Sequence, residues 1–200
     1  MTLLRMLKRA VTLLEKTAAR YCLVGGHAAS LYRAQERLTR DIDFALVASN
    51  PRASREVAGN VIQQLGFRPI DGFLPHGVGE KRRVAAAMVS AAPKGDEEHG
   101  IIDILLPELP WITEAVERAQ YNKIDLGFAR VPVITPEDLV LAKCYALKNS
   151  PDRFQDLDDL KAIFSAIKDL DLDYLDASMA RLKVVIPEAV ARFAPSSRRS

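Results

Sequence analysis

One short run of apolar residues constrains the fold more than any other part of this sequence. Residues 101–106 read Ile-Ile-Asp-Ile-Leu-Leu and are bounded by Gly100 and Pro107. Such a run of aliphatic residues is typical of a strand buried inside a sheet. Asp103 interrupts it, and a charge at such a position is costly unless it is paired or binds a metal ion. The run therefore predicts a central strand whose carboxylate is either ion-paired or a metal ligand.

The remaining patterns in residues 1–134 alternate between predicted helices and strands. Further strands are expected at 21–24, 41–47, 83–91 and 130–134, and helices at 1–18, 27–33, 51–65 and 111–120. The helix at 51–65 has the clearest ends, because Asn50 is a good cap, Pro51 suits the first helical position and Gly66 follows the last. The rest of residues 67–100 is expected to form loops, and the aromatic residues Trp111 and Tyr121 are expected in the core.

From Thr135 onward the sequence predicts helices alone, at about 136–148, 152–167, 171–183 and 187–193. Thr135 is a capping residue, and Pro136 with two following acids suits a first helical turn. We therefore expect an α/β (α+β) fold in two parts. A mixed sheet flanked by helices would occupy residues 1–134, and a C-terminal helical subdomain would occupy residues 135–200.

Composition excludes several classes of protein. No apolar stretch reaches the 18 or more residues that a membrane-spanning helix needs. The first ten residues interleave charge with leucine, unlike a secretory signal. Two cysteines, Cys22 and Cys144, are too few for a disulfide framework or a four-ligand zinc site. We therefore expect a cytoplasmic protein with reduced cysteines and no membrane partner.

Charge is unevenly distributed along the chain. Residues 1–40 carry eight Lys or Arg against two Glu, whereas residues 41–160 carry thirteen against nineteen Asp or Glu. A basic N-terminal segment before an acidic middle indicates an anionic partner at one end. The alternative is a set of ordinary solvated helix faces.

Two aspartates in the strand at 41–47 add to the one at Asp103. Asp41 and Asp43 point to the same face, roughly 7 Å apart at Cα, while Ile42 and Phe44 face the other way and can pack. If this strand lies beside residues 101–106, three carboxylates converge. Oxygen ligands without nearby His or Cys select Mg²⁺ or Mn²⁺ and suit phosphoryl-type transfer. A solvated edge, or pairing of Asp103 with Arg40 or Arg83, is the structural alternative.

A glycine pair, Gly25-Gly26, follows the apolar strand at 21–24 and precedes a helix. Glycine permits close approach of a ligand to the backbone, so the pair can form a phosphate cradle. It can equally be a plain turn. It is neither a Walker loop nor a Gly-x-Gly-x-x-Gly fingerprint.

These motifs together resemble a known family. Val24-Gly25-Gly26-His27-Ala28, then Arg37-Leu38-Thr39-Arg40-Asp41-Ile42-Asp43, resembles the signature of the DNA polymerase β-like nucleotidyltransferase superfamily. The residues before the aspartates are similar to the bacterial branch that includes AbiEii-type abortive-infection toxins. Residues 139–143 and 153–160 resemble the two C-terminal motifs of that branch. The resemblance therefore spans about residues 20–165.

The resemblance implies a role for each matching residue. Gly25 and Gly26 would hold a triphosphate, Asp41 and Asp43 would bind the catalytic Mg²⁺ or Mn²⁺, and Asp103 would be the third carboxylate and the base. Lys143 would neutralise triphosphate charge, and Asp156 would orient that region. His27 and Arg40 are further candidates for nucleotide contact.

Several of these residues also have purely structural interpretations. His27 could be a local cap, and Arg33, Arg37 and Arg40 could be surface charge rather than groups that steer a nucleotide or nucleic acid. Lys143 could extend its charged end to solvent. Asp156, Asp158 and Asp159 could form a solvated face.

The implied activity is metal-dependent transfer of an NMP from an NTP to an acceptor hydroxyl. A tRNA or other RNA, or a protein, is the favoured acceptor, and the setting would be a toxin–antitoxin or phage-defence system. A homodimer or an antitoxin partner is compatible with this activity. His27 and Gln155 replace residues frequent in the AbiEii-like branch, so a catalytically inactive nucleotide-, RNA- or protein-binding module remains an alternative. A nucleotidyltransferase acting on a small molecule, such as an antibiotic, is another.

Overall fold

The computed structural model describes residues 2–35, 39–70, 87–95 and 100–195. The chain divides into two compact units. The first comprises Met1–His27 and Leu38–Ile134, and the second comprises Ala28–Arg37 and Thr135–Ser200. The fold is mixed α/β, as the sequence predicts.

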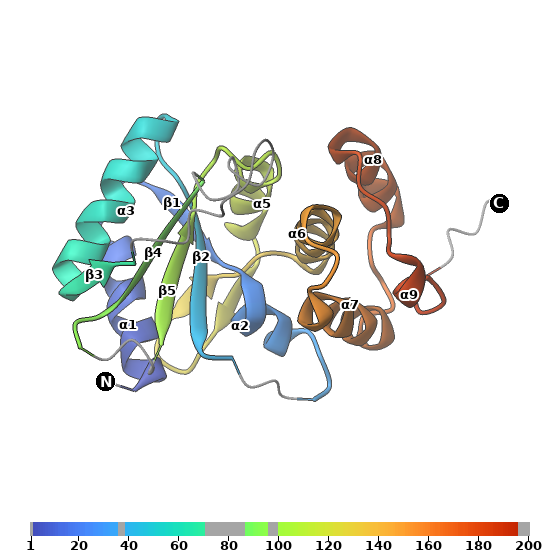
Figure 1. The fold of residues 1–200 in the computed structure, drawn as a ribbon, viewed down its shortest axis with the longest axis horizontal. Helices are drawn as coiled ribbons and strands as arrows, with labels where there is room; N and C mark the ends of the chain where they lie inside the picture. Colours follow the sequence, from blue (N-terminus) through green and yellow to red (C-terminus); the bar gives the residue numbers. More distant parts are fainter. Residues whose placement is uncertain (1, 36–38, 71–86, 96–99, 196–200) are drawn as a thin grey trace. The chain divides into compact units, whose positions relative to one another are not determined.

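A five-stranded mixed sheet forms the centre of the first unit (Figure 1). Its order is β1-β2-β5-β4-β3, in which β2 and β5 are parallel and the other neighbouring pairs are antiparallel. The strands are β1 (Arg20–Leu23), β2 (Asp41–Val47), β3 (Phe67–Pro69), β4 (Met88–Pro93) and β5 (Ile101–Leu105). The strand that carries Asp103 therefore lies in the middle of the sheet, which confirms its prediction as a central strand.

Apolar side chains of β2 and β5 build the core of this unit. Ile42, Phe44, Ile102 and Ile104 are fully buried. The Phe44 ring also makes an edge contact with the ring of Tyr21 on β1, with centroids 5.9 Å apart. Alternation along β2 thus places its apolar residues in the core and leaves the intervening aspartates on the opposite face.

Three longer helices belong to the first unit: α1 (Leu3–Leu14), α3 (Pro51–Leu65) and α5 (Ile112–Ala119). Helices α1 and α3 pack side by side, while α5 packs on β1 and β2 (Figure 1). The predicted ends of α3 are confirmed. Asn50 accepts a hydrogen bond from the Ala53 amide, and Gly66 ends the helix with a φ of 75°.

Short elements differ most from the sequence prediction. The residues of strand β3 were expected to form a loop. Strand β6 (Lys123–Asp125) was not predicted, and it pairs with β7 (Arg130–Pro132) in a separate two-stranded sheet. The strand predicted at 83–91 appears as β4, and residues 83–86 lie outside the described residues. Trp111 is buried, but Tyr121 is 92% exposed, so its assignment to the core was wrong.

The second unit contains α6 (Pro136–Asn149), α7 (Phe154–Ala166), α8 (Leu172–Leu182) and α9 (Glu188–Ala191). Helix α6 packs against α7 and α8, and α7 packs against α9. Thr135 caps α6 as expected, and its hydroxyl also donates a hydrogen bond to Asp138. Helix α2 (Gly25–Leu31) begins in the first unit and continues into the second.

Within the part of the chain that the structure describes, no helix combines the length and apolar character needed to cross a bilayer.

Candidate functional site

The register of two parallel strands brings the predicted carboxylates onto neighbouring positions. Asp43 on β2 lies directly beside Asp103 on β5, and Asp41 lies beside Ile101 at the start of the same pair. Asp41 is exposed, whereas Asp43 and Asp103 are half-buried. The sequence left open whether these strands are neighbours, and the structure shows that they are.

Asp103 is held in an unusual environment for a carboxylate. The Ser90 hydroxyl on β4 donates a hydrogen bond to it, while Oδ1 has no hydrogen-bond partner among the described residues. Burial raises the pKa of Asp103, and the nearby negative charge of Asp41 raises it further against the lowering effect of Ser90. A buried carboxylate oxygen without a donor is costly to retain unless something else binds it.

The glycine pair lies against Asp43. Gly25 has a φ of 62°, in the left-handed region that favours glycine, and a Cβ at this position would lie 2.0 Å from Asp43 Oδ2. The Gly26 amide donates a hydrogen bond to the same oxygen at 3.4 Å. The sequence suggested a role for these glycines in phosphate binding. The structure adds a steric requirement, because the carboxylate occupies the space that a side chain at position 25 would fill.

Two other predicted residues flank this arrangement. His27 Nδ1–H donates to the backbone carbonyl of Asp41 at 3.1 Å, so the ring ties α2 to the first residue of β2. Arg40 is exposed and immediately precedes β2. The structure thus brings Gly25, Gly26, His27, Asp41, Asp43 and Asp103 into one region of the first unit.

The implied Mg²⁺ or Mn²⁺ can be compared with the donors on this sheet. Carboxylate oxygens are the ligands these ions prefer, the register aligns Asp43 with Asp103, and Asp103 Oδ1 is unpartnered among the described residues. In the present side-chain positions, however, no three His, Cys, Asp or Glu side chains of the described residues form a metal-binding group. The donors therefore fit the ion in kind and in backbone position, and their side chains would have to turn to share it.

Lys143 and Asp156 lie in the second unit, within one ionic cluster. Lys143 Nζ donates to Asp156 Oδ1 at 2.8 Å, and Arg153 donates to Asp156 Oδ2. Both Lys143 and Asp156 are buried, so the structural alternatives of a solvent-extended lysine and a solvated aspartate do not hold. Burial alone would raise the pKa of Asp156. The charge of Lys143 and the hydrogen bonds from Arg153 and Lys143 outweigh it and hold that pKa below its usual range.

Two further members of this cluster were named from the sequence, but their pairing was not predicted. Asp159 is buried and also ion-paired to Lys143, and Arg33 is ion-paired to both Asp158 and Asp159. The spacing of Asp156 and Asp159 was the available signal, because residues three apart on a helix share a face. Because a run of acidic residues is usually solvated, this spacing was not interpreted as a buried, ion-paired face.

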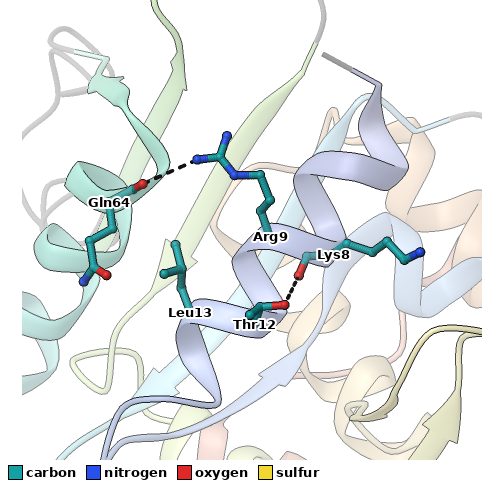
Figure 2. Close-up of a pocket in the computed structure, with 5 residues that line it drawn as sticks. All are labelled: Lys8, Arg9, Thr12, Leu13 and Gln64. Carbon is teal, nitrogen blue, oxygen red and sulfur yellow. Dashed lines mark hydrogen bonds between the residues drawn. The ribbon is translucent and has the colours of Figure 1, made fainter.

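A small hollow of about 240 Å³ lies elsewhere on the first unit, between α1 and α3 (Figure 2). It is lined by Lys8, Arg9, Thr12, Leu13 and Gln64. The Arg9 guanidinium crosses it to donate to the backbone carbonyls of Gln64 and Leu65 near the end of α3. Arg9 thus satisfies carbonyls at a helix terminus, and none of the predicted site residues lines this hollow.

A model of the protein family described as "Nucleotidyl transferase AbiEii toxin, Type IV TA system" matches residues 8–192. No curated protein matches the chain.

Solved structures with a similar fold include the following two. The antibiotic-resistance factor ANT(2'')-Ia is 16% identical with a TM-score of 0.54, over 88% of this chain and 90% of that one. An antigenic nucleotidyltransferase-like protein from Paracoccidioides brasiliensis is 14% identical with a TM-score of 0.51, over 94% and 96%. At these identities the likeness shows a common nucleotidyltransferase-like fold.

Proposed function

Because the chain belongs to the AbiEii nucleotidyltransferase toxin family, we propose that it transfers an NMP from an NTP to an acceptor hydroxyl with the help of Mg²⁺ or Mn²⁺. One observation carries the proposal. Asp43 lies beside Asp103 across two parallel strands and against Gly25 and Gly26 at the start of α2, which joins the two motifs that such a reaction needs.

Asp41, Asp43 and Asp103 would hold the metal ions. When bound, the metal ions would neutralise the negative charge that develops on the phosphate oxygens. The unpartnered Oδ1 of Asp103 is available for that purpose among the described residues.

Asp103 is also our candidate for the base. Its oxygen would accept the proton of the acceptor hydroxyl, and the raised pKa of this carboxyl suits proton acceptance better than that of an exposed aspartate. The freed hydroxyl oxygen would form a bond to the α-phosphorus, and the bond to the pyrophosphate oxygen would break.

The glycine pair and the second unit would handle the triphosphate. At Gly25 and Gly26 the backbone carries no side chains, so phosphate oxygens can approach its amides closely. His27 and Arg40 flank this segment and are proposed as further nucleotide contacts. Lys143 would supply positive charge to the triphosphate, and Asp156 would orient it.

The family and the charge pattern support a proposal for the acceptor and the cellular setting. We propose an RNA acceptor, with tRNA foremost and a protein as the next candidate, because residues 1–40 are strongly basic. The family description supports a toxin role with an antitoxin partner in the same system.

Label transfer tests this proposal. The protein would be incubated with Mg²⁺ or Mn²⁺, each of four α-labelled NTPs, and an extract of small RNA and protein, beside an Asp41→Ala/Asp43→Ala double variant. Label entering RNA only with the wild type supports the proposal. Label entering protein, or an antibiotic added in a separate reaction, would keep the reaction and change the acceptor. A folded wild type that binds NTP and labels nothing favours a binding module instead.

A further inference from the structure

Lys143 is held by two aspartates that lie one turn apart on α7. Its Nζ is 2.8 Å from Asp156 Oδ1 and 2.6 Å from Asp159 Oδ2. Lys143 is 5% exposed and Asp159 is fully buried. An ammonium group has three N–H donors, and these two ion pairs use two of them. Among the described residues, one donor of Lys143 is therefore left for a ligand.

The second oxygen of Asp159 is also occupied. Arg33 Nη1 donates to Asp159 Oδ1 at 2.8 Å, while Arg33 Nη2 donates to Asp158 Oδ2 at the same distance. The Arg33 side chain is only 9% exposed. Arg33 is therefore a largely buried, ion-paired residue, which contradicts the alternative of ordinary surface charge. Asp159 joins the two cations Lys143 and Arg33 through its two oxygens.

Burial makes this arrangement sensitive to the loss of Asp159. Its carboxylate neutralises charge on both Lys143 and Arg33 where water cannot replace it. Asp158 serves as a natural comparison, because it pairs with the same Arg33 but its side chain is 60% exposed. Among the described residues, the ion pairs of Lys143 are with Asp156 and Asp159 and not with Asp158. Changes at the two positions should therefore differ in their effect on Lys143.

We infer that Asp159 is a positioning residue for triphosphate binding, which fixes the Lys143 ammonium and leaves its third donor for a phosphate oxygen. The inference rests on the proposed function in its assignment of Lys143 to the triphosphate. Asp159 acts only through Lys143 and does not itself contact the nucleotide. Its second bond, to Arg33, keeps the carboxylate from following Lys143 if the lysine moves.

Calorimetric binding of inorganic tripolyphosphate tests this inference without knowledge of the base or the acceptor. Asp159→Asn should weaken binding about tenfold or more, because an amide cannot neutralise and orient the ammonium as the carboxylate does. Asp158→Asn, the matched control, should bind like the wild type. In a Lys143→Met background, Asp159→Asn should have no further effect. The KM for NTP should rise in Asp159→Asn with a smaller change in kcat.

Folding of each variant would be checked by circular dichroism and thermal unfolding. If Asp159→Asn does not fold, Asp159→Glu takes its place, and its binding should lie measurably below that of the wild type. The inference is overturned if a folded Asp159 variant binds tripolyphosphate as tightly as the wild type does. It is also overturned if Asp158→Asn weakens that binding as much as Asp159→Asn does, or if the wild type does not bind tripolyphosphate.

The two proposals fail in different ways. If the wild type transfers nucleotide, and Asp159→Asn binds tripolyphosphate and reacts as the wild type does, only the inference about Asp159 fails and the proposed function stands. A wild type that transfers no label but shows the expected order of tripolyphosphate binding removes the proposed function, and leaves Asp159 as the organiser of a phosphate-binding lysine.

Discussion

The carboxylate of Asp43 occupies the space that a side chain at Gly25 would fill, so the roles proposed for these two residues depend on each other. The carboxylate can lie against the start of α2 only because position 25 has no Cβ, and the backbone can adopt its positive φ there at little cost only because the residue is glycine. A change at Gly25 should therefore act through Asp43 as well as through the backbone.

Gly25→Ala is expected to destabilise the protein by at least ~1 kcal/mol, since an L-residue is strained at this φ, and to abolish transfer by displacing Asp43. Gly59→Ala is the control. Gly59 lies inside α3 with open space around a new Cβ, so that change should stabilise by about 0.5–1 kcal/mol and leave transfer unchanged. Urea unfolding and label transfer measure both effects. Normal transfer by Gly25→Ala would contradict the steric account.

Asp156 makes stability depend on pH in a defined direction. Its pKa is lowered in the folded protein, so its contribution is complete above the unfolded value of about 3.9 and is lost as pH falls through the folded pKa. Asp156→Asn should cost on the order of 3 kcal/mol at neutral pH, because a buried ion pair loses one partner. The difference from wild type in unfolding free energy should then shrink below about pH 4.

The exposed Asp152 provides the matched control, and Asp152→Asn should follow the wild type at every pH. Unfolding by urea between pH 7 and pH 3 provides the measurement. A difference between Asp156→Asn and wild type that stays constant or grows on acidification would show that the stabilisation does not come from the ionised carboxylate.

Elements whose ends are set by local chemistry could be predicted from the sequence, and elements set by tertiary contacts could not. The bounds predicted for β2 and α3 are those observed, because alternation defines the strand, and Asn50, Pro51 and Gly66 define the helix. Strands β3 and β6 have three residues each and depend on pairing with β4 and β7, which no local pattern records. Likewise, the ion pairs of Lys143 could not be predicted from the sequence, because they depend on which face of α7 packs against α6.

The cap of α3 gives a prediction at the scale of this element. Asn50 Oδ1 accepts the Ala53 amide at 2.9 Å, so Asn50→Ala should destabilise the protein by about 1 kcal/mol without altering the sheet. Gln63→Ala changes an exposed side chain in the last turn of the same helix and should stay within about 0.5 kcal/mol of wild type. Urea unfolding compares the two. Equal stability of Asn50→Ala and Gln63→Ala would mean that packing alone fixes the start of α3.

At the scale of the whole molecule, the two units carry different parts of the proposed reaction. The first unit holds the glycine pair and the three aspartates, and the second holds the lysine with its carboxylates. The order of these motifs in the sequence was enough to indicate the family. The arrangement of side chains within each unit was not, because the burial of Asp159 and the contact of Asp43 with Gly25 arise from folding.

The central claim is that the bond broken lies at the α-phosphate, and paired labels test it most directly. The wild type would be given the same NTP labelled at the α- or the γ-phosphate, with Mg²⁺ and the acceptor extract, beside Asp43→Asn and the exposed control Asp176→Asn. We predict that α-label enters the acceptor and γ-label leaves as pyrophosphate, with wild type and Asp176→Asn alike and Asp43→Asn inactive. Transfer of the γ-label to the acceptor, or undiminished α-label transfer by Asp43→Asn, would contradict the account.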